Sequence, residues 1–204
     1  MRESYQPWRK LLPCVAVRCR ALPCVAVRRV KSQTSQRLQD DRGDADLGIR
    51  YGRGNWRDLE VKPFMPETLY PVANRALAAQ LTKQRHRRGD AALLDVPLLH
   101  DGDATGWRAW FGALDIPLKL RAQDRRFEDY TVVLAAAEAG LGVALARTPL
   151  AAAYLERSGL VRVSRHEVAS PLGYYFVHAK GESRPHVLAL IERMQRVLAA
   201  APSK

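Results

Sequence analysis

Apolar residues follow the period of an amphipathic helix in two parts of the chain. In the first, four residues at positions i, i+3, i+4 and i+7 predict one buried helix face: Trp107, Trp110, Phe111 and Leu114. In the second, five residues predict an apolar stripe along a last helix, which Ser183 caps: Val187, Leu190, Ile191, Met194 and Leu198. We expect both stripes to face a hydrophobic core, and the aromatic residues not to form a stacking platform for bases.

The other helices are predicted from residues that cap helix ends. A hydroxyl, amide or carboxylate side chain before an apolar run starts a helix, and glycine commonly ends one. These signals predict helices that follow Ser35, Asn74, Asp129 and Thr148-Pro149 and that end near Asp41, Leu81, Ala139 and Gly159.

Short runs of aliphatic, β-branched or aromatic residues predict strands between these helices. The runs lie at residues 46–51, 97–100, 141–145, 160–163 and 174–177. Residues 59–72 are interpreted as extended chain broken by prolines, and residues 83–90 as a polar loop. This alternation of helices and strands favours an α/β sandwich with mainly parallel sheets.

Residues 1–31 differ from the rest of the chain in charge. They hold eight Lys and Arg residues against Glu3 alone, so they carry +7 of the net charge of +12. The segment contains a direct repeat, LPCVAVR, at residues 12–18 and 22–28. The residues between the copies are too few for a parallel crossover, so the copies form a hairpin or stay unstructured. We interpret residues 1–29 as a basic, disordered tail, with weak, salt-sensitive contact with nucleic acid as the alternative.

Several classes of protein are excluded by the residues that the chain lacks. No apolar run approaches the roughly 20 residues that span a bilayer, and Arg18 and Arg20 interrupt any signal peptide. The three cysteines and five histidines match no metal-ligand spacing, and no nucleophile elbow or phosphate-binding loop is present. We therefore expect a cytoplasmic protein without a metal, cofactor or membrane partner that is not an enzyme.

Four blocks of sequence, taken together and in order, resemble the effector domain of LysR-type transcription regulators. They are DLGIRYGRGNW at 46–56, PLLHD at 97–101 before the Trp-rich helix, FED at 127–129 with AGLGVAL at 139–145, and GLV at 159–161 with YYFV at 174–177 before the last helix. The resemblance covers roughly residues 34–198. It is strongest to the subgroup that includes regulators of glycine cleavage and of β-lactamase.

The resemblance implies an α/β fold like that of type 2 periplasmic binding proteins, with two α/β lobes around a ligand cleft. It places the effector-binding domain at residues 30–204. The first lobe is expected at about 30–63 plus 183–200, and the second at about 70–177. Strand ends and helix N-termini that face such a cleft offer N–H groups, which suit a small anionic or polar effector.

By the same resemblance, nine residues are candidate effector contacts because they end a strand or begin a helix: Thr34, Ser35, Arg50, Tyr51, His100, Asp101, Thr105, Phe127 and Asp129. Each has a purely structural alternative. The hydroxyl and carboxylate side chains at helix starts could be helix caps without contacting an effector. The rings of Tyr51 and Phe127 could pack in the core or at its rim. Arg50 can pair with Asp44 or Asp46.

The chain departs from the family pattern ahead of Thr34. The winged helix-turn-helix, the linker helix, and the first strand and helix of the first lobe are not recognisable there. We therefore expect an incomplete, marginally stable first lobe, unless residues 25–30 or the tail fill the gap.

Partners are implied only by the resemblance. A small-molecule effector is expected, together with a homodimer or pairing with an intact LysR-type relative. DNA binding belongs to the intact family, and here it would be at most non-specific and through the tail. Two alternatives are a free-standing solute-binding protein of the same fold and an inert remnant of a truncated regulator gene.

Overall fold

The fold is described from a computed structural model, for residues 32–33 and 46–199. The described residues divide into two compact units. Unit 1 runs from Glu67 to Pro171, and unit 2 comprises the described residues on either side of it. Helices and strands are mixed in unit 1, as expected for an α/β protein.

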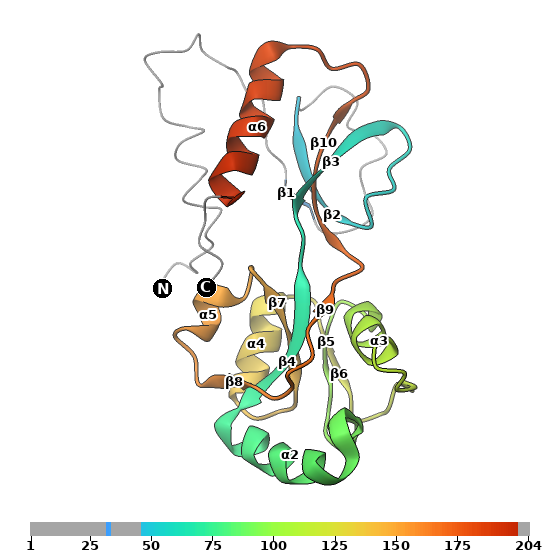
Figure 1. Ribbon diagram of the computed structural model, residues 1–204, viewed down its shortest axis with the longest axis vertical. Helices are drawn as coiled ribbons and strands as arrows, with labels where there is room; N and C mark the ends of the chain where they lie inside the picture. The colour runs from blue at the N-terminus through green and yellow to red at the C-terminus, as the bar shows by residue number, and fades with distance from the viewer. Residues whose placement is uncertain (1–31, 34–45, 200–204) are drawn as a thin grey trace. The chain divides into compact units, whose positions relative to one another are not determined.

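Unit 2 is built on a four-stranded sheet with the order β1–β2–β10–β3 (Figure 1). Its strands are β1 (Ser32–Gln33), β2 (Gly48–Gly52), β3 (Leu59–Met65) and β10 (Gly173–Ala179). β1 is parallel to β2, whereas β10 is antiparallel to both of its neighbours.

One expectation about the first lobe is corrected by this sheet. We placed residues 174–177 in the second lobe, but β10 pairs with β2 and β3, so it belongs to unit 2. The expected loss of the first strand and helix concerns residues that lie mostly outside the described ones; β1, just before Thr34, pairs with β2. The predicted helix at 35–41 lies outside the described residues.

Helix α6 (Pro185–Ala199) packs against this sheet through four residues of its predicted apolar stripe, Val187, Leu190, Ile191 and Met194. Val187 and Ile191 are buried together with Leu47 and Phe176. The Phe64 ring packs on Phe176 with their centroids 4.3 Å apart. The helix begins at Pro185, two residues after the expected cap.

Unit 1 contains a sheet with the order β7–β4–β8, in which β9 also pairs with β4, and a two-stranded β5–β6 sheet (Figure 1). The strands are β4 (Thr68–Asn74), β5 (Leu99–Asp101), β6 (Arg125–Phe127), β7 (Ala144–Thr148), β8 (Leu160–Arg162) and β9 (Val168–Ala169). The helices are α2 (Arg75–Arg88), the 3₁₀ helix η2 (Gly89–Asp95), α3 (Thr105–Gly112), α4 (Tyr130–Glu138) and α5 (Ala152–Leu155).

The prediction of mainly parallel sheets is wrong for the sheet around β4. This strand is antiparallel to β7, β8 and β9, whereas β5 and β6 form a parallel pair and Leu98 forms a parallel bridge with Val143. The reason is the route of the chain. β4 follows β3 of unit 2 after a short link, so it does not enter its sheet through the helical crossover that parallel neighbours need.

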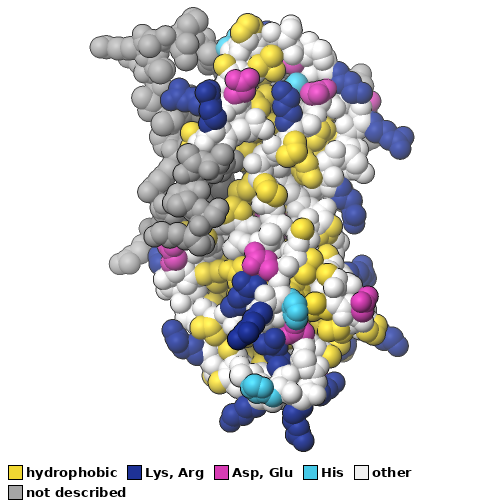
Figure 2. Space-filling view, viewed as in Figure 1, with side chains coloured by type: hydrophobic (Ala, Val, Ile, Leu, Met, Phe, Trp, Pro, Cys, Tyr) yellow, Lys and Arg dark blue, Asp and Glu magenta, His cyan; other side chains and the backbone are white. Residues whose placement is uncertain are grey.

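The aromatic stripe of α3 forms the centre of the larger core, as predicted. Trp107, Trp110 and Phe111 are each at most 1% exposed. The Trp110 and Phe111 rings meet edge to face with centroids 5.0 Å apart. Both indole N–H groups are satisfied, since Trp107 donates to the Leu99 carbonyl and Trp110 to the His166 carbonyl. Many Lys and Arg side chains lie on the face of the molecule that Figure 2 shows.

Two of the predicted helix caps are confirmed. The Asn74 side chain accepts a hydrogen bond from the Leu77 N–H at 2.9 Å, and Asp129 accepts one from the Thr131 N–H at 2.6 Å. Thr148 does not cap a helix, because it lies in β7 and α5 starts only at Ala152.

The polar loop predicted at residues 83–90 is wrong, because α2 continues through Arg88 and is followed directly by η2. Lys, Arg and Gln have high helix propensity, so polarity alone does not indicate a loop. Arg85 also anchors this part of the helix. Its guanidinium pairs with Asp90 at 2.6 Å and donates to the Val163 carbonyl.

We expect Phe111→Ala to lower the free energy of unfolding by about 3–5 kcal/mol, because it empties a closely packed site. Urea denaturation at 25 °C measures the change, and Phe111→Leu should give a smaller loss in the same direction. Val132→Ala is the matched control, since Val132 is 46% exposed on α4. A loss no larger than that of the control would contradict the assignment of Phe111 to the core.

Candidate functional site

Arg147 on β7 lies at the centre of a buried polar group in unit 1. It is only 8% exposed. Its Nε and Nη2 donate to the two carboxylate oxygens of Glu67 at 3.2 and 3.1 Å, and its Nη1 donates to Asp101. We call these three residues the carboxylate–arginine cluster. The two-point contact with Glu67 is the geometry in which a guanidinium holds a carboxylate most firmly.

Tyr130, the first residue of α4, supports the arginine from a second direction. Its hydroxyl accepts a hydrogen bond from the Arg147 backbone N–H at 2.8 Å and donates to the Leu145 carbonyl at 3.2 Å. The guanidinium lies over the Tyr130 ring, 4.9 Å from its centroid. Burial raises the pKa of Tyr130, so the phenol remains neutral and able to donate.

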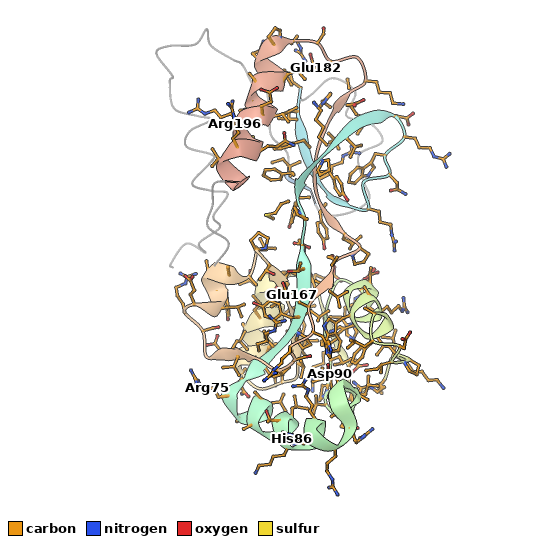
Figure 3. All side chains as sticks on the ribbon, in the orientation of Figure 1. Arg75, His86, Asp90, Glu167, Glu182 and Arg196 are labelled. Atoms are coloured by element: carbon orange, nitrogen blue, oxygen red, sulfur yellow. The ribbon has the colours of Figure 1, made fainter. Side chains whose placement is uncertain are left out.

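Strand register brings the members of the cluster together. Thr68 of β4 is opposite Thr148 of β7, and their hydroxyl oxygens are 2.6 Å apart. Arg147 is opposite Leu69, and Glu67 lies two residues before Leu69, so the Glu67 and Arg147 side chains are on the same side of the sheet and meet diagonally. Thr68 also donates to Glu167, which is labelled in Figure 3.

Asp101 is held by the β5–β6 pair. It is the last residue of β5 and is opposite Phe127 of β6. The next residue, Gly102, donates its backbone N–H to the Phe127 carbonyl at 2.9 Å. Gly102 has φ 72°, a conformation that favours glycine, so the chain can turn sharply after the carboxylate.

The cluster carries an excess of negative charge. Two carboxylates face one guanidinium, which is already engaged by both. Burial raises the pKa of Asp101, Arg147 opposes that shift, and the nearby carboxylates Asp129 and Asp103 add to it. Because these carboxylates repel further negative charge, the site favours a cationic or hydrogen-bond-donating group over the anionic one that helix N-termini suggested.

His100 lies next to Asp101 on β5, but it has a different environment. Successive residues of a strand face opposite sides, and the His100 side chain is buried, with the residue only 5% exposed. Neither ring nitrogen has a hydrogen-bond partner, although the Asp103 backbone lies near the ring. Burial lowers the pKa of His100, and Asp124 partly opposes that shift.

The other candidates in unit 1 have identifiable structural roles. Asp129 is exposed and caps α4, so the cap interpretation accounts for it. Thr105 begins α3, and its N–H donates to the Asp103 side chain at 2.7 Å, so the capping carboxylate is Asp103. Phe127 packs, half-buried, against the core cluster that contains α4.

Arg50 and Tyr51 belong to β2 of unit 2. The Arg50 guanidinium lies 5.6 Å from the centroid of the Trp56 ring. Pairing of Arg50 with Asp46 is not found, since Asp46 pairs with Arg184 at 2.8 Å. Tyr51 packs on Tyr174 with ring centroids 4.9 Å apart. Thr34, Ser35 and Asp44 lie outside the described residues.

Three residues of this site were missed from sequence: Glu67, Tyr130 and Arg147. The sequence did offer a sign of Arg147, because it directly follows the apolar run at 141–146, and a charge in a buried strand needs a partner. Glu67 lies between Pro66 and Thr68 with no such signal. Its role depends on a partner that is 80 residues away in the chain.

Two negative observations apply to the part of the chain that the structure describes. No group of three or more His, Cys, Asp or Glu side chains is arranged to hold a metal ion there. No helix in those residues is both long enough and apolar enough to cross a bilayer.

Comparison with models of known families assigns the chain to a protein family. A model of the LysR substrate binding domain matches residues 7–199. The chain belongs to this LysR family. The match begins within the segment that we interpreted as a separate tail, so the family pattern extends further toward the N-terminus than the boundary expected at residue 30.

Relatives within the LysR family are transcription regulators. The glycine cleavage system transcriptional activator of Escherichia coli strain K12 is 32% identical over 149 residues, which is 72% of this chain and 48% of that protein. The transcriptional activator AmpR of Citrobacter freundii is 27% identical over 148 residues, with the same coverage. The chain therefore spans about half the length of these relatives.

Solved structures of LysR-family effector domains share the fold. The effector domain of AmpR from Pseudomonas aeruginosa matches with a TM-score of 0.63 and 27% identity, over 76% of this chain and 72% of that one. The effector-binding domain of AmpR from Citrobacter freundii gives 0.63 and 22%, over 76% and 75%. The fold implied by the sequence, an α/β fold like that of periplasmic binding proteins, is thereby confirmed.

The raised pKa of Asp101 predicts a pH-dependent effect of removing its charge. The folded state binds a proton at Asp101 more readily than the unfolded state does. The stability contributed by this group is therefore fully present below the ordinary carboxyl pKa of 3.8 and is lost as the pH rises through the folded value. The stability of Asp101→Asn relative to wild type should increase between about pH 3 and pH 7.

Urea denaturation at several pH values measures this difference. Asp58→Asn is the control, because it removes the same charge from an exposed position. A relative stability of Asp101→Asn that stays level or falls as the pH rises would contradict a raised pKa.

Proposed function

We propose that this chain is the effector-sensing domain of a LysR-type transcription regulator, and that it binds a small metabolite. The observation that carries the proposal is the family match over residues 7–199, together with relatives named as transcriptional activators. Those relatives act as whole proteins about twice as long as the matched region. The activity proposed for this chain is therefore sensing, which the intact regulator would convert into a change in transcription.

We further propose that the effector contacts Asp101, beside Arg147. Three properties support this position. The Asp101 side chain is 28% exposed, whereas that of Glu67 is fully covered, so Asp101 is the member of the cluster open to a ligand. Arg147 is already engaged by both carboxylates. Asp101 was also among the residues that the family resemblance selected.

The charge of the cluster restricts the class of effector. A ligand with an ammonium or guanidinium group would offset the excess negative charge, and its N–H groups would donate to the Asp101 carboxylate. Burial raises the pKa of Asp101 and the nearby carboxylates raise it further, so a ligand with only carboxylate or phosphate groups would add to the repulsion. We therefore propose an effector that carries a cationic group.

Binding at Asp101 would also affect Glu67. Arg147 pairs with both Asp101 and Glu67, and Glu67 lies in the short link between β3 of unit 2 and β4 of unit 1. A ligand that competes with Arg147 for Asp101 would change the balance of charge on Glu67. We expect the first change in conformation in the link that contains Glu67, between β3 and β4.

A thermal-shift screen of the purified chain tests the proposal. The ligands should include amines, amino acids and uncharged or anionic compounds of matched size. A cationic effector at about 100 times its Kd should stabilise the native state by about 2.7 kcal/mol, which raises the Tm by several degrees. The shift should be lost in Asp101→Asn and kept in Asp58→Asn.

Two outcomes would contradict different parts of the proposal. A shift with anionic ligands alone, or one kept in Asp101→Asn, would refute the proposed contact but leave sensing intact. A cooperative melt that no ligand shifts would count against sensing by this chain.

A further inference from the structure

Helix α2 has a basic residue at its start and five more in its last six positions, and it contains no acidic residue. Its 14 residues include six Lys, Arg or His side chains: Arg75, Lys83, Arg85, His86, Arg87 and Arg88. Figure 2 shows dark blue Lys and Arg side chains gathered around a cyan histidine in the region where Figure 1 places α2.

Two of these six side chains form ion pairs with described residues. Arg85 pairs with the buried Asp90 at 2.6 Å, and Arg88 pairs with Asp95 at 2.5 Å. The other four, which include the labelled Arg75 and His86 of Figure 3, are exposed and have no ion pair within the described residues. We call this set the α2 basic face: Arg75, Lys83, His86 and Arg87.

The stability of the helix does not account for the α2 basic face. Cations in the last turn do interact favourably with the helix dipole, which explains residues 85–88 in part. Arg75 lies in the first turn, where the same dipole repels a cation. Lys83 and Arg87 are four residues apart, and like charges at this spacing destabilise a helix by a few tenths of a kcal/mol.

The exposed side chains of α2 indicate which kind of partner could bind there. The surface beside the cations consists of small or polar residues, Ala76, Ala79, Gln80 and Thr82. It offers no large apolar side chain to insert into a membrane and no aromatic ring on which an unpaired base could stack. What remains is positive charge along a helix, which suits the phosphates of a double helix.

We infer that the α2 basic face binds the phosphate backbone of duplex DNA without reading its sequence. Arg75 and Arg87 are separated by about 18 Å along the helix axis, which corresponds to roughly five base pairs. The long side chains can therefore reach more than one phosphate. This contact uses other residues than the proposed effector site and other residues than the basic segment 1–31, and it would add salt-sensitive affinity to a regulator that acts on DNA.

The experiment measures binding of the full chain to a fluorescent 20-base-pair duplex by anisotropy, between 50 and 200 mM salt. The test variant is Lys83→Gln/Arg87→Gln. The matched control is Arg53→Gln/Arg57→Gln, which removes the same charge from exposed positions in unit 2. A third variant, Arg28→Gln/Arg29→Gln, reports on the N-terminal basic segment.

The loss of two phosphate contacts should reduce the slope of log affinity against log salt by about 1.8. At 50 mM salt the test variant should bind about tenfold more weakly or worse, and the control should stay within about twofold of wild type. Thermal melts of the test and control variants should be similar to that of wild type, because Arg53, Arg57, Lys83 and Arg87 are exposed.

Three results would overturn the inference. The test variant could keep the wild-type slope, which would assign any DNA binding to other parts of the chain. The control could lose as much affinity as the test variant, which would indicate net charge alone. The test substitutions could instead abolish binding to anionic phospholipid vesicles while the duplex is not bound at all, which would identify a membrane surface as the partner.

Discussion

A guanidinium that is almost wholly removed from water must be paired, and this constraint governs the arrangement of unit 1. Removal of an ion from water costs several kcal/mol unless partners and hydrogen bonds replace the solvent. Arg147 meets the requirement with Glu67 on one side, Asp101 on another and the Tyr130 ring beneath it. These contacts tie β7 to the start of β4 and the end of β5.

The same constraint determines the chemistry of the site. An isolated Arg147 would attract anions, but its two carboxylate partners leave the cluster negative, and Asp101 is the more exposed of these two carboxylates. The helix N-termini and strand ends that first suggested an anionic effector are present in unit 1. Some of their N–H groups already donate to side chains of the same unit. Asp103 accepts such a hydrogen bond at the start of α3, and Asp129 accepts one at the start of α4.

Local sequence patterns predicted those features that depend on neighbours in the chain. The aromatic face of α3 follows from a helical period, and the caps Asn74 and Asp129 follow from the residue that precedes a helix. The polar loop predicted at residues 83–90 was wrong, because the basic residues that suggested a loop are also good helix formers. Strand direction could not be predicted, since it depends on the route of the chain between units.

The candidate site was only partly predictable for the same reason. Asp101 was identified through its place at the end of a strand in a family motif. Its partners come from β4 and β7, and Glu67 and Arg147 are brought together by a β-register that no local pattern contains. His100 was selected with Asp101, yet strand alternation places the two side chains on opposite sides.

The most direct test of this account is a double-mutant cycle between Glu67 and Arg147, built from Glu67→Gln, Arg147→Met and the combined variant. Urea denaturation gives the free energy of unfolding of each protein. The exposed Arg126–Glu128 pair, with side chains 64% and 83% exposed, serves as the reference cycle. If the buried pair organises unit 1, its coupling energy should be about 2 kcal/mol or more, against less than about 1 kcal/mol for the exposed pair. A coupling energy near zero for Glu67 and Arg147 would contradict the account.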